Sequence, residues 1–161
     1  MWIAIGAGVV ATLAFFFVMF VVVPKIVIDK VRERLEQRVV DEVPADQVVQ
    51  QDITAVSLGL GSRGVGQSRG NGALVLTPTE LRWLQLKPTS SDVTIPLAAI
   101  TTVDTARSHL GKRYGKPLLR VTFDAGAGPD TMAWLTTDLS GWLAALAPAD
   151  AAGGPEPAVE P

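Results

Sequence analysis

Two short apolar runs stand side by side in the stretch Ala73-Leu-Val-Leu-Thr-Pro-Thr-Glu-Leu-Arg-Trp-Leu-Gln-Leu86 of this 161-residue chain. Residues 73–77 and 81–86 are short runs rich in aliphatic and aromatic side chains, in which apolar and polar positions alternate. Between the two runs, Pro78-Thr79 is placed to turn the chain. The stretch therefore predicts two consecutive β-strands joined by a short turn.

The same period of two recurs on both sides of this pair. Further runs cover residues 53–58, 93–97, 100–107, 119–123 and 131–136, and turn-forming segments separate them. About seven short strands at regular spacing are typical of a β-barrel or a β-sandwich. The sequence thus predicts a mainly β domain over residues 45–147.

A single helix is expected to close this domain. Asp138 is placed as its N-cap, and an apolar face follows at helical spacing. That face consists of Leu139, Trp142, Leu143 and Leu146. We expect Trp142 to plug the mouth of the barrel rather than to contact a ligand.

The domain resembles the pleckstrin-homology-like (PH-like) fold, and within it the GRAM and related bacterial domains. The resemblance rests on Gly72-Ala-Leu-Val-Leu-Thr-Pro-Thr-Glu-Leu-Arg-Trp83 and on Ile95-Pro-Leu-Ala-Ala-Ile-Thr-Thr-Val103. The segments Arg69-Gly-Asn-Gly72 and Ser108-His-Leu-Gly-Lys112 look like those of bacterial single-pass membrane proteins with such a domain. The resemblance implies a seven-strand barrel or sandwich capped by a C-terminal helix, and it implies little about the ligand.

Before the domain, Trp2 to Val23 runs without a charged side chain. A helix of this length would measure about 33 Å, enough to cross a bilayer core of about 30 Å. We therefore expect residues 1–24 to form a transmembrane anchor in the lipid bilayer. A cleaved signal peptide is the less favoured alternative, because the apolar run is long and ends without small residues.

The charges after this run predict its orientation. Lys25, Lys30, Arg32 and Arg34 follow the apolar run, and no basic side chain precedes it. The positive-inside rule then places the N-terminus outside and the C-terminal domain in the cytoplasm, at the cell inner membrane. Within the run, Ala4, Gly8 and Thr12 share one helix face at the spacing of small residues that allows helices to dimerise.

Two segments flank the domain. Residues 25–44 are expected to form a juxtamembrane helical stalk, with Val27, Val31, Leu35 and Val39 as a narrow apolar stripe. We favour packing of this stripe on the following domain over a membrane-surface or self-pairing helix. Residues 148–161 are rich in Ala, Pro, Gly and Glu and are expected to be disordered.

Composition excludes several kinds of chemistry. The net charge of −2 argues against nucleic-acid binding, which favours basic chains. The chain has no Cys and one His, so it offers neither thiolate chemistry nor a site with two His ligands. No paired carboxylates and no metal-ligand spacing are found, and the sequence indicates no cofactor.

The segment Gly59-Leu-Gly-Ser-Arg-Gly64 matches the glycine spacing of dinucleotide-binding loops. Such loops need a helix that opens at the last Gly and directs its N-terminus at the phosphates. Here Val65-Gly-Gln-Ser-Arg-Gly70 follows, a poor helix former. A loop is therefore favoured over a nucleotide site.

A basic cluster is the better candidate for a site. Residues 105–121 contain five bases and no acid, and the Gly-rich segment adds two bases if it folds toward them. The candidate residues for binding an anion, a lipid or a partner are Arg63, Arg69, Arg107, Lys112, Arg113, Lys116 and Arg120. Such bases can clamp a phosphate group or the acidic face of a protein, and the alternative is a solvated loop.

These features favour a membrane-anchored, non-enzymatic PH-like binding module that recruits a protein partner or contacts anionic lipid at the cytoplasmic face. One alternative is a structural subunit of a membrane complex that works through the anchor and the stalk. A third, less favoured, is a nucleotide-binding enzyme that uses the Gly-rich loop. The fold of residues 61–72 discriminates, because a hairpin supports a binding module and a helix after Gly64 supports the enzyme.

Overall fold

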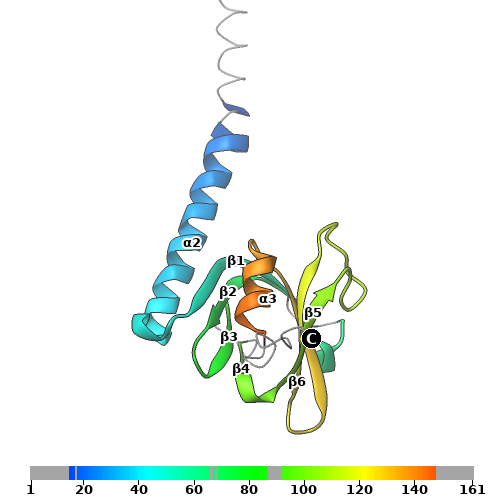
Figure 1. Cartoon of the computed structure of the whole chain (residues 1–161). Coiled ribbons are helices and arrows are strands. Elements are labelled where there is room, and N and C mark those ends of the chain that lie inside the picture. The colour runs from blue at the N-terminus through cyan, green and yellow to red at the C-terminus, as the bar shows by residue number, and fades with distance from the viewer. Residues whose placement is uncertain (1–14, 17, 66, 68, 87–91, 148–161) are drawn as a thin grey trace, which may run out of the picture.

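The computed structural model describes residues 15–16, 18–65, 67, 69–86 and 92–147 (Figure 1). Within these residues the domain is one antiparallel sheet of seven strands in the order β4-β3-β2-β1-β7-β6-β5. The strands are β1 Gln50–Leu60, β2 Gly70–Leu76, β3 Glu80–Gln85, β4 Val93–Pro96, β5 Ile100–Ala106, β6 Leu118–Asp124 and β7 Pro129–Leu135. The seven strands expected from the sequence are all present, and most of their ends differ by a few residues.

Residues 73–86 contain most of the β2–β3 hairpin. Leu76 pairs with Leu81 and Leu74 with Trp83 across the two strands. Thr77 closes the turn, because its N–H donates to the carbonyl of Glu80 at 2.9 Å and its hydroxyl accepts from the Glu80 N–H at 3.1 Å. The bond to the Thr77 hydroxyl gives the Glu80 N–H an acceptor at the turn, where the backbone hydrogen bonds between β2 and β3 stop.

The sheet bends around helix α3, Leu139–Ala145, which covers its inner face (Figure 1). Asp138 caps this helix as predicted, since its carboxylate accepts from the Gly141 N–H at 2.9 Å. This bond and one from the Ser140 hydroxyl lower the pKa of Asp138. Trp142 is 1% exposed and packs in the inner core with Trp83 and Trp134.

The hydrogen-bonded sheet does not close into a barrel. Strands β4 and β5 are its two edges, although they follow each other along the chain. The short 3₁₀ turn η4, Leu97–Ala99, connects them and carries the chain from one edge to the other. Partly buried Leu97 and Ile100 pack on the inner core beside this opening, and they also line a depression of about 430 Å³ with the end of α3.

The outer face of the sheet is covered by helix α2, Val23–Glu42. Its side chains Leu35 and Val39, and Val43 just after it, pack against β2 and β3 in a second apolar cluster. The expected apolar stripe therefore packs on the domain over the second half of the helix. Earlier in the stripe, Val27 is 55% exposed, and Figure 1 shows this part of α2 extending away from the sheet.

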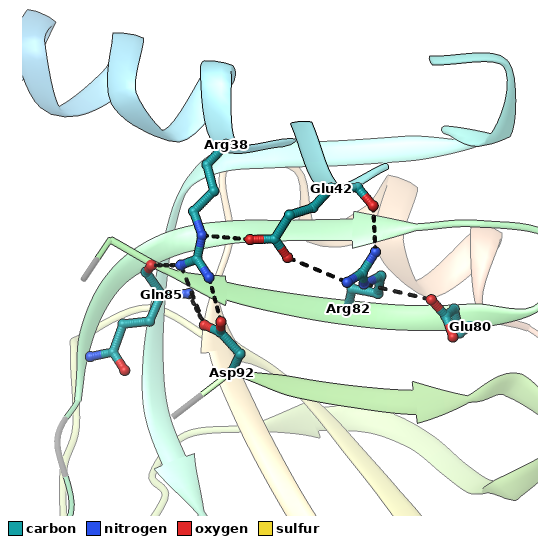
Figure 2. Close-up of polar contacts among 6 residues, drawn as sticks. All are labelled: Arg38, Glu42, Glu80, Arg82, Gln85 and Asp92. Atoms are coloured by element: carbon teal, nitrogen blue, oxygen red, sulfur yellow. Dashed lines mark hydrogen bonds and ion pairs between the residues drawn. The ribbon is translucent and has the colours of Figure 1, made fainter. Parts of the chain in front are cut away.

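Polar side chains at the edge of this second cluster hold α2 to the sheet (Figure 2). Arg38 donates to Glu42 at 2.8 Å, one turn further along the helix, and also to Asp92 and the Gln85 carbonyl. Burial lowers the pKa of Arg38, but its bonds to Asp92 and Glu42 outweigh that effect and raise the pKa above its ordinary value. The guanidinium thus joins α2, the end of β3 and the residue before β4.

A second guanidinium makes a similar link from β3, three residues before Gln85. Arg82 in β3 donates to the Glu42 carbonyl oxygen at 2.8 Å and lies 3.4 Å from its carboxylate (Figure 2). Glu42 therefore stands between Arg38 and Arg82, and its backbone carbonyl at the C-terminus of α2 receives a side-chain donor. The register of α2 on the sheet is fixed by both charged and apolar contacts.

The expected transmembrane helix is not supported. Among the described residues no helix is both long enough and apolar enough to cross a membrane. The longest, α2, carries charged side chains along its length, and each would cost about 2.5–3.5 kcal/mol at a bilayer centre. Most of the expected anchor, including Ala4, Gly8 and Thr12, lies outside the described residues, as does the tail after residue 147.

Candidate anion-binding site

The basic residues expected between β5 and β6 lie on a loop with a defined tip. His109 and Lys112 form an isolated β-bridge, in which each backbone N–H donates to the other residue's carbonyl at 3.0 Å. Leu110 and Gly111 between them have φ values of 47° and 77°. Two consecutive residues in the left-handed region are typical of a tight hairpin turn, and Gly favours the second position.

His109 fixes this tip to the sheet. Its side chain is buried, and Nε2 lies 3.0 Å from the carbonyl oxygen of Gly59 in β1. Burial is the main reason that the pKa of His109 falls below its ordinary value, and the positive charge of Arg69 and Arg120 adds to it. At neutral pH the imidazole is therefore uncharged and donates through Nε2 to Gly59.

The Gly-rich segment folds against the same tip. The Arg69 guanidinium donates to the Leu110 carbonyl at 3.4 Å, which joins the residue before β2 to the β5–β6 loop. Arg63 ends the 3₁₀ turn η3, Gly61–Arg63, near the other end of the segment. The two segments are thus brought together as the sequence analysis allowed, although neither Arg63 nor Arg69 lines the hollow described next.

Three of the candidate bases surround one hollow. Arg107, Arg113 and Lys116 line a depression of about 450 Å³ together with Gly115 and Pro117. All three bases are exposed, and none of them forms an ion pair with a carboxylate that the structure describes. Unpaired bases around a concave surface attract anions and keep their donors available for them. We call this depression the basic hollow.

The other two candidates lie apart from the basic hollow. Lys112 is exposed at the tip of the loop and is not among the lining residues. Arg120 in β6 faces Asp104 in β5, and its Nε donates to the Asp104 carboxylate at 2.8 Å. This bond lowers the pKa of Asp104 and raises that of Arg120, so the Arg120 charge is already matched within the sheet.

A second hollow adjoins the basic hollow and shares Lys116 and Pro117 with it. It measures about 420 Å³ and is lined further by Thr54, Leu135, Thr136, Thr137 and Leu139. These residues come from β1, the end of β7 and the start of α3, which are far apart in the sequence. No spacing in the sequence predicts this lining, because it depends on the order of the strands. We call this depression the threonine–leucine hollow.

Buried Asp52 organises one wall of the threonine–leucine hollow. Its carboxylate accepts from the Thr54 hydroxyl at 2.8 Å and from the Thr137 hydroxyl at 2.9 Å. The backbone N–H groups of both threonines donate to it as well. Thr136 differs, because its hydroxyl oxygen is buried without a hydrogen-bond partner among the described residues. Asp52 thus joins β1 to the segment that leads into α3.

The Gly-rich segment does not form a phosphate cradle. After the single turn η3, Gly64 has a φ of 65°, and β2 begins at Gly70. The Gln67 side chain fills the bend, since its amide donates to the Leu60 carbonyl and accepts from the Leu60 N–H at 2.6 and 2.7 Å. The described part of this segment holds no helix after Gly64.

Other chemistry lacks support in the described part of the chain. Within it, no group of three His, Asp or Glu side chains could hold a metal ion. The single imidazole bonds to a backbone carbonyl, and no described carboxylate hydrogen-bonds to it. Compared with family models, curated proteins and solved structures, the chain matches none of them. The PH-like and GRAM identity therefore stays a prediction.

Proposed function

We propose that this protein is a non-enzymatic binding module that holds an anionic group of a protein partner in the basic hollow. The observation that carries the proposal is the set of Arg107, Arg113 and Lys116 around one depression without described ion pairs. A carboxylate or a phosphate entering there would receive charge-assisted hydrogen bonds from more than one base. Such bonds are about twice as strong as those between neutral groups.

The scaffold supports this proposal by holding the loop in place. The loop has a tight turn at its tip, and His109 ties that tip to β1. The loop bases therefore lose less conformational freedom on binding than bases on an unanchored loop would.

The experiment is a binding titration with a fluorescent acidic peptide, followed by anisotropy at low and at physiological salt. We expect Lys116→Glu and Arg113→Glu each to weaken binding about tenfold or more, since each replaces an attraction with a repulsion. Lys30→Glu is the matched control, because it changes the net charge equally on an exposed part of α2, which extends away from the sheet. Added salt should weaken binding to the wild-type chain.

Two results would remove the proposal. The first is equal loss of binding in Lys30→Glu and Lys116→Glu, which would mean that only net charge matters. The second is binding to vesicles of anionic lipid that the peptide cannot displace, which would make a lipid headgroup the ligand instead.

A further inference from the structure

The basic hollow, which holds the anionic group, lies beside the threonine–leucine hollow. Lys116 and Pro117 line both hollows, so the two adjoin at these residues. A ligand that binds in the basic hollow therefore has a second surface of different chemistry directly beside it. This inference rests on the proposed function and states what kind of partner segment would use both surfaces.

The second hollow offers apolar contact together with hydroxyl groups. Leu135 and Leu139 are only partly buried, so their methyl groups are available to a ligand. Thr54 and Thr137 already donate their hydroxyl hydrogens to Asp52, which leaves their oxygens as acceptors. A surface that combines methyl groups with hydrogen-bond acceptors suits a peptide, which brings apolar side chains and N–H donors. A free phosphate or a lipid headgroup brings no apolar part at this place.

Two side chains of one peptide reach both hollows only if they lie on the same side of the chain. The side chains of an extended chain alternate between two faces, and the chain advances about 3.3 Å per residue. Side chains two positions apart therefore share a face and lie about 6.6 Å apart. Because the two hollows share Lys116 and Pro117, we infer that the partner presents an extended peptide with an acidic side chain and an apolar side chain two positions apart.

The test uses glycine–serine peptides with a fluorescent label and the full-length chain. One peptide carries a single Glu, one a single Leu, and a series carries both at separations of one to six residues. We expect the tightest binding at a separation of two, about tenfold tighter than the peptide with Glu alone, because burying Leu adds to the bond made by Glu. The wild-type series alone tests the spacing, so the result does not depend on a variant that folds.

A variant then tests whether the tighter binding of the Glu–Leu peptides arises in the threonine–leucine hollow. Leu135→Asn should remove the advantage of the Glu–Leu peptides and leave the Glu-only peptide unchanged. Leu97→Asn is the matched control, because Leu97 is also a partly buried leucine that packs on the inner core but lines neither hollow.

The outcomes separate this inference from the proposed function. If Glu–Leu peptides bind no tighter than Glu alone, or if spacing makes no difference, the inference fails and the proposed function stands. If the Glu-only peptide does not bind to the basic hollow at all, both fail. If anionic vesicles bind and no peptide competes with them, the peptide inference is overturned in favour of a lipid.

Discussion

The Nε2 atom of His109 lies 3.0 Å from the carbonyl oxygen of Gly59, and fifty residues separate the two along the chain. This contact joins the loop that carries the basic hollow to the central strand β1. At Gly59 itself φ is 101°, and Gln67 side-chain atoms lie within 3 Å of the place that a Cβ atom would take. The same short piece of β1 therefore supports both the basic loop and the Gly-rich segment.

The first prediction concerns pH. Burial lowers the pKa of His109, so the folded chain binds fewer protons than the unfolded chain below the ordinary His pKa of about 6.5. The stability contributed by neutral His109 is thus complete above that pH and is lost as the pH falls below it. Urea unfolding at pH 7 and pH 5 should show this loss in the wild-type chain.

His109→Gln separates this effect from the titration of carboxylates. Glutamine can donate to the Gly59 carbonyl but does not titrate, so the variant should lose less stability between pH 7 and pH 5 than the wild-type chain. An equal loss in both would mean that His109 is not the group responsible.

The second prediction concerns Arg120, which pairs with Asp104. Arg120→Ala should lower the free energy of unfolding by at most about 1 kcal/mol, because both side chains are more than one third exposed and water screens the pair. It should leave peptide binding unchanged, in contrast to Lys116→Glu. Parallel unfolding and anisotropy measurements on both variants check this, and a large loss of affinity in Arg120→Ala would extend the site to β6.

Arg120 also lowers the pKa of Asp104, so the stability that this pair contributes depends on pH in the acid range. The stabilisation by the pair is present above the unfolded Asp pKa of about 3.9 and is lost as the pH falls through the lower pKa of folded Asp104. Arg120→Ala should remove that part of the acid sensitivity and leave the sensitivity near pH 6 intact.

The third prediction concerns the packing of α2. Leu35 is 1% exposed, so Leu35→Ala should cost about 2–5 kcal/mol, the usual range for a buried leucine. Val27→Ala, in the same stripe but half exposed, should cost less than about 0.5 kcal/mol. Denaturant unfolding of both variants gives the comparison. Similar losses of unfolding free energy in the two variants would mean that the second half of α2 does not pack on the sheet.

The fourth prediction concerns the polar clamp between α2 and the sheet. Arg38→Ala removes one partner of Asp92 and one partner of Glu42, and we expect a loss of about 1–3 kcal/mol because the guanidinium is largely buried. Arg32→Ala, whose pair with Glu36 is exposed, should cost about 0.5 kcal/mol or less. A double-mutant cycle of Arg38→Ala with Asp92→Asn measures the coupling, and additivity would show that the two residues do not interact.

Local patterns predicted most of the fold. The alternation in each strand, the turn at Thr77 and the cap at Asp138 depend on neighbouring residues, so the sequence alone reveals them. The stripe on α2 likewise predicted the residues that pack on the sheet. The sequence could not predict in the same way that the sheet stays open, because this depends on whether the two edge strands, β4 and β5, form hydrogen bonds with each other.

The candidate site was predictable only in part. The run of bases between β5 and β6 is visible in the sequence, but the register that pairs Arg120 with Asp104 is not. The threonine–leucine hollow is lined by residues of β1, β7 and α3, which only the folded chain brings together. The contact of Arg38 in α2 with Asp92 before β4 likewise joins residues that are far apart in the sequence. The transmembrane helix was inferred from the length of one apolar run, most of which lies outside the described residues, and the described helices do not support it.

The most direct test of the central claim is amide chemical-shift mapping of the full-length chain during a titration with pyrophosphate. Our account predicts that the largest shifts fall on Arg107, Arg113, Gly115 and Lys116, and that they disappear in Lys116→Glu but persist in Lys30→Glu. Shifts centred on Gly59 to Gly64, or the absence of saturable shifts at the basic hollow, would contradict it.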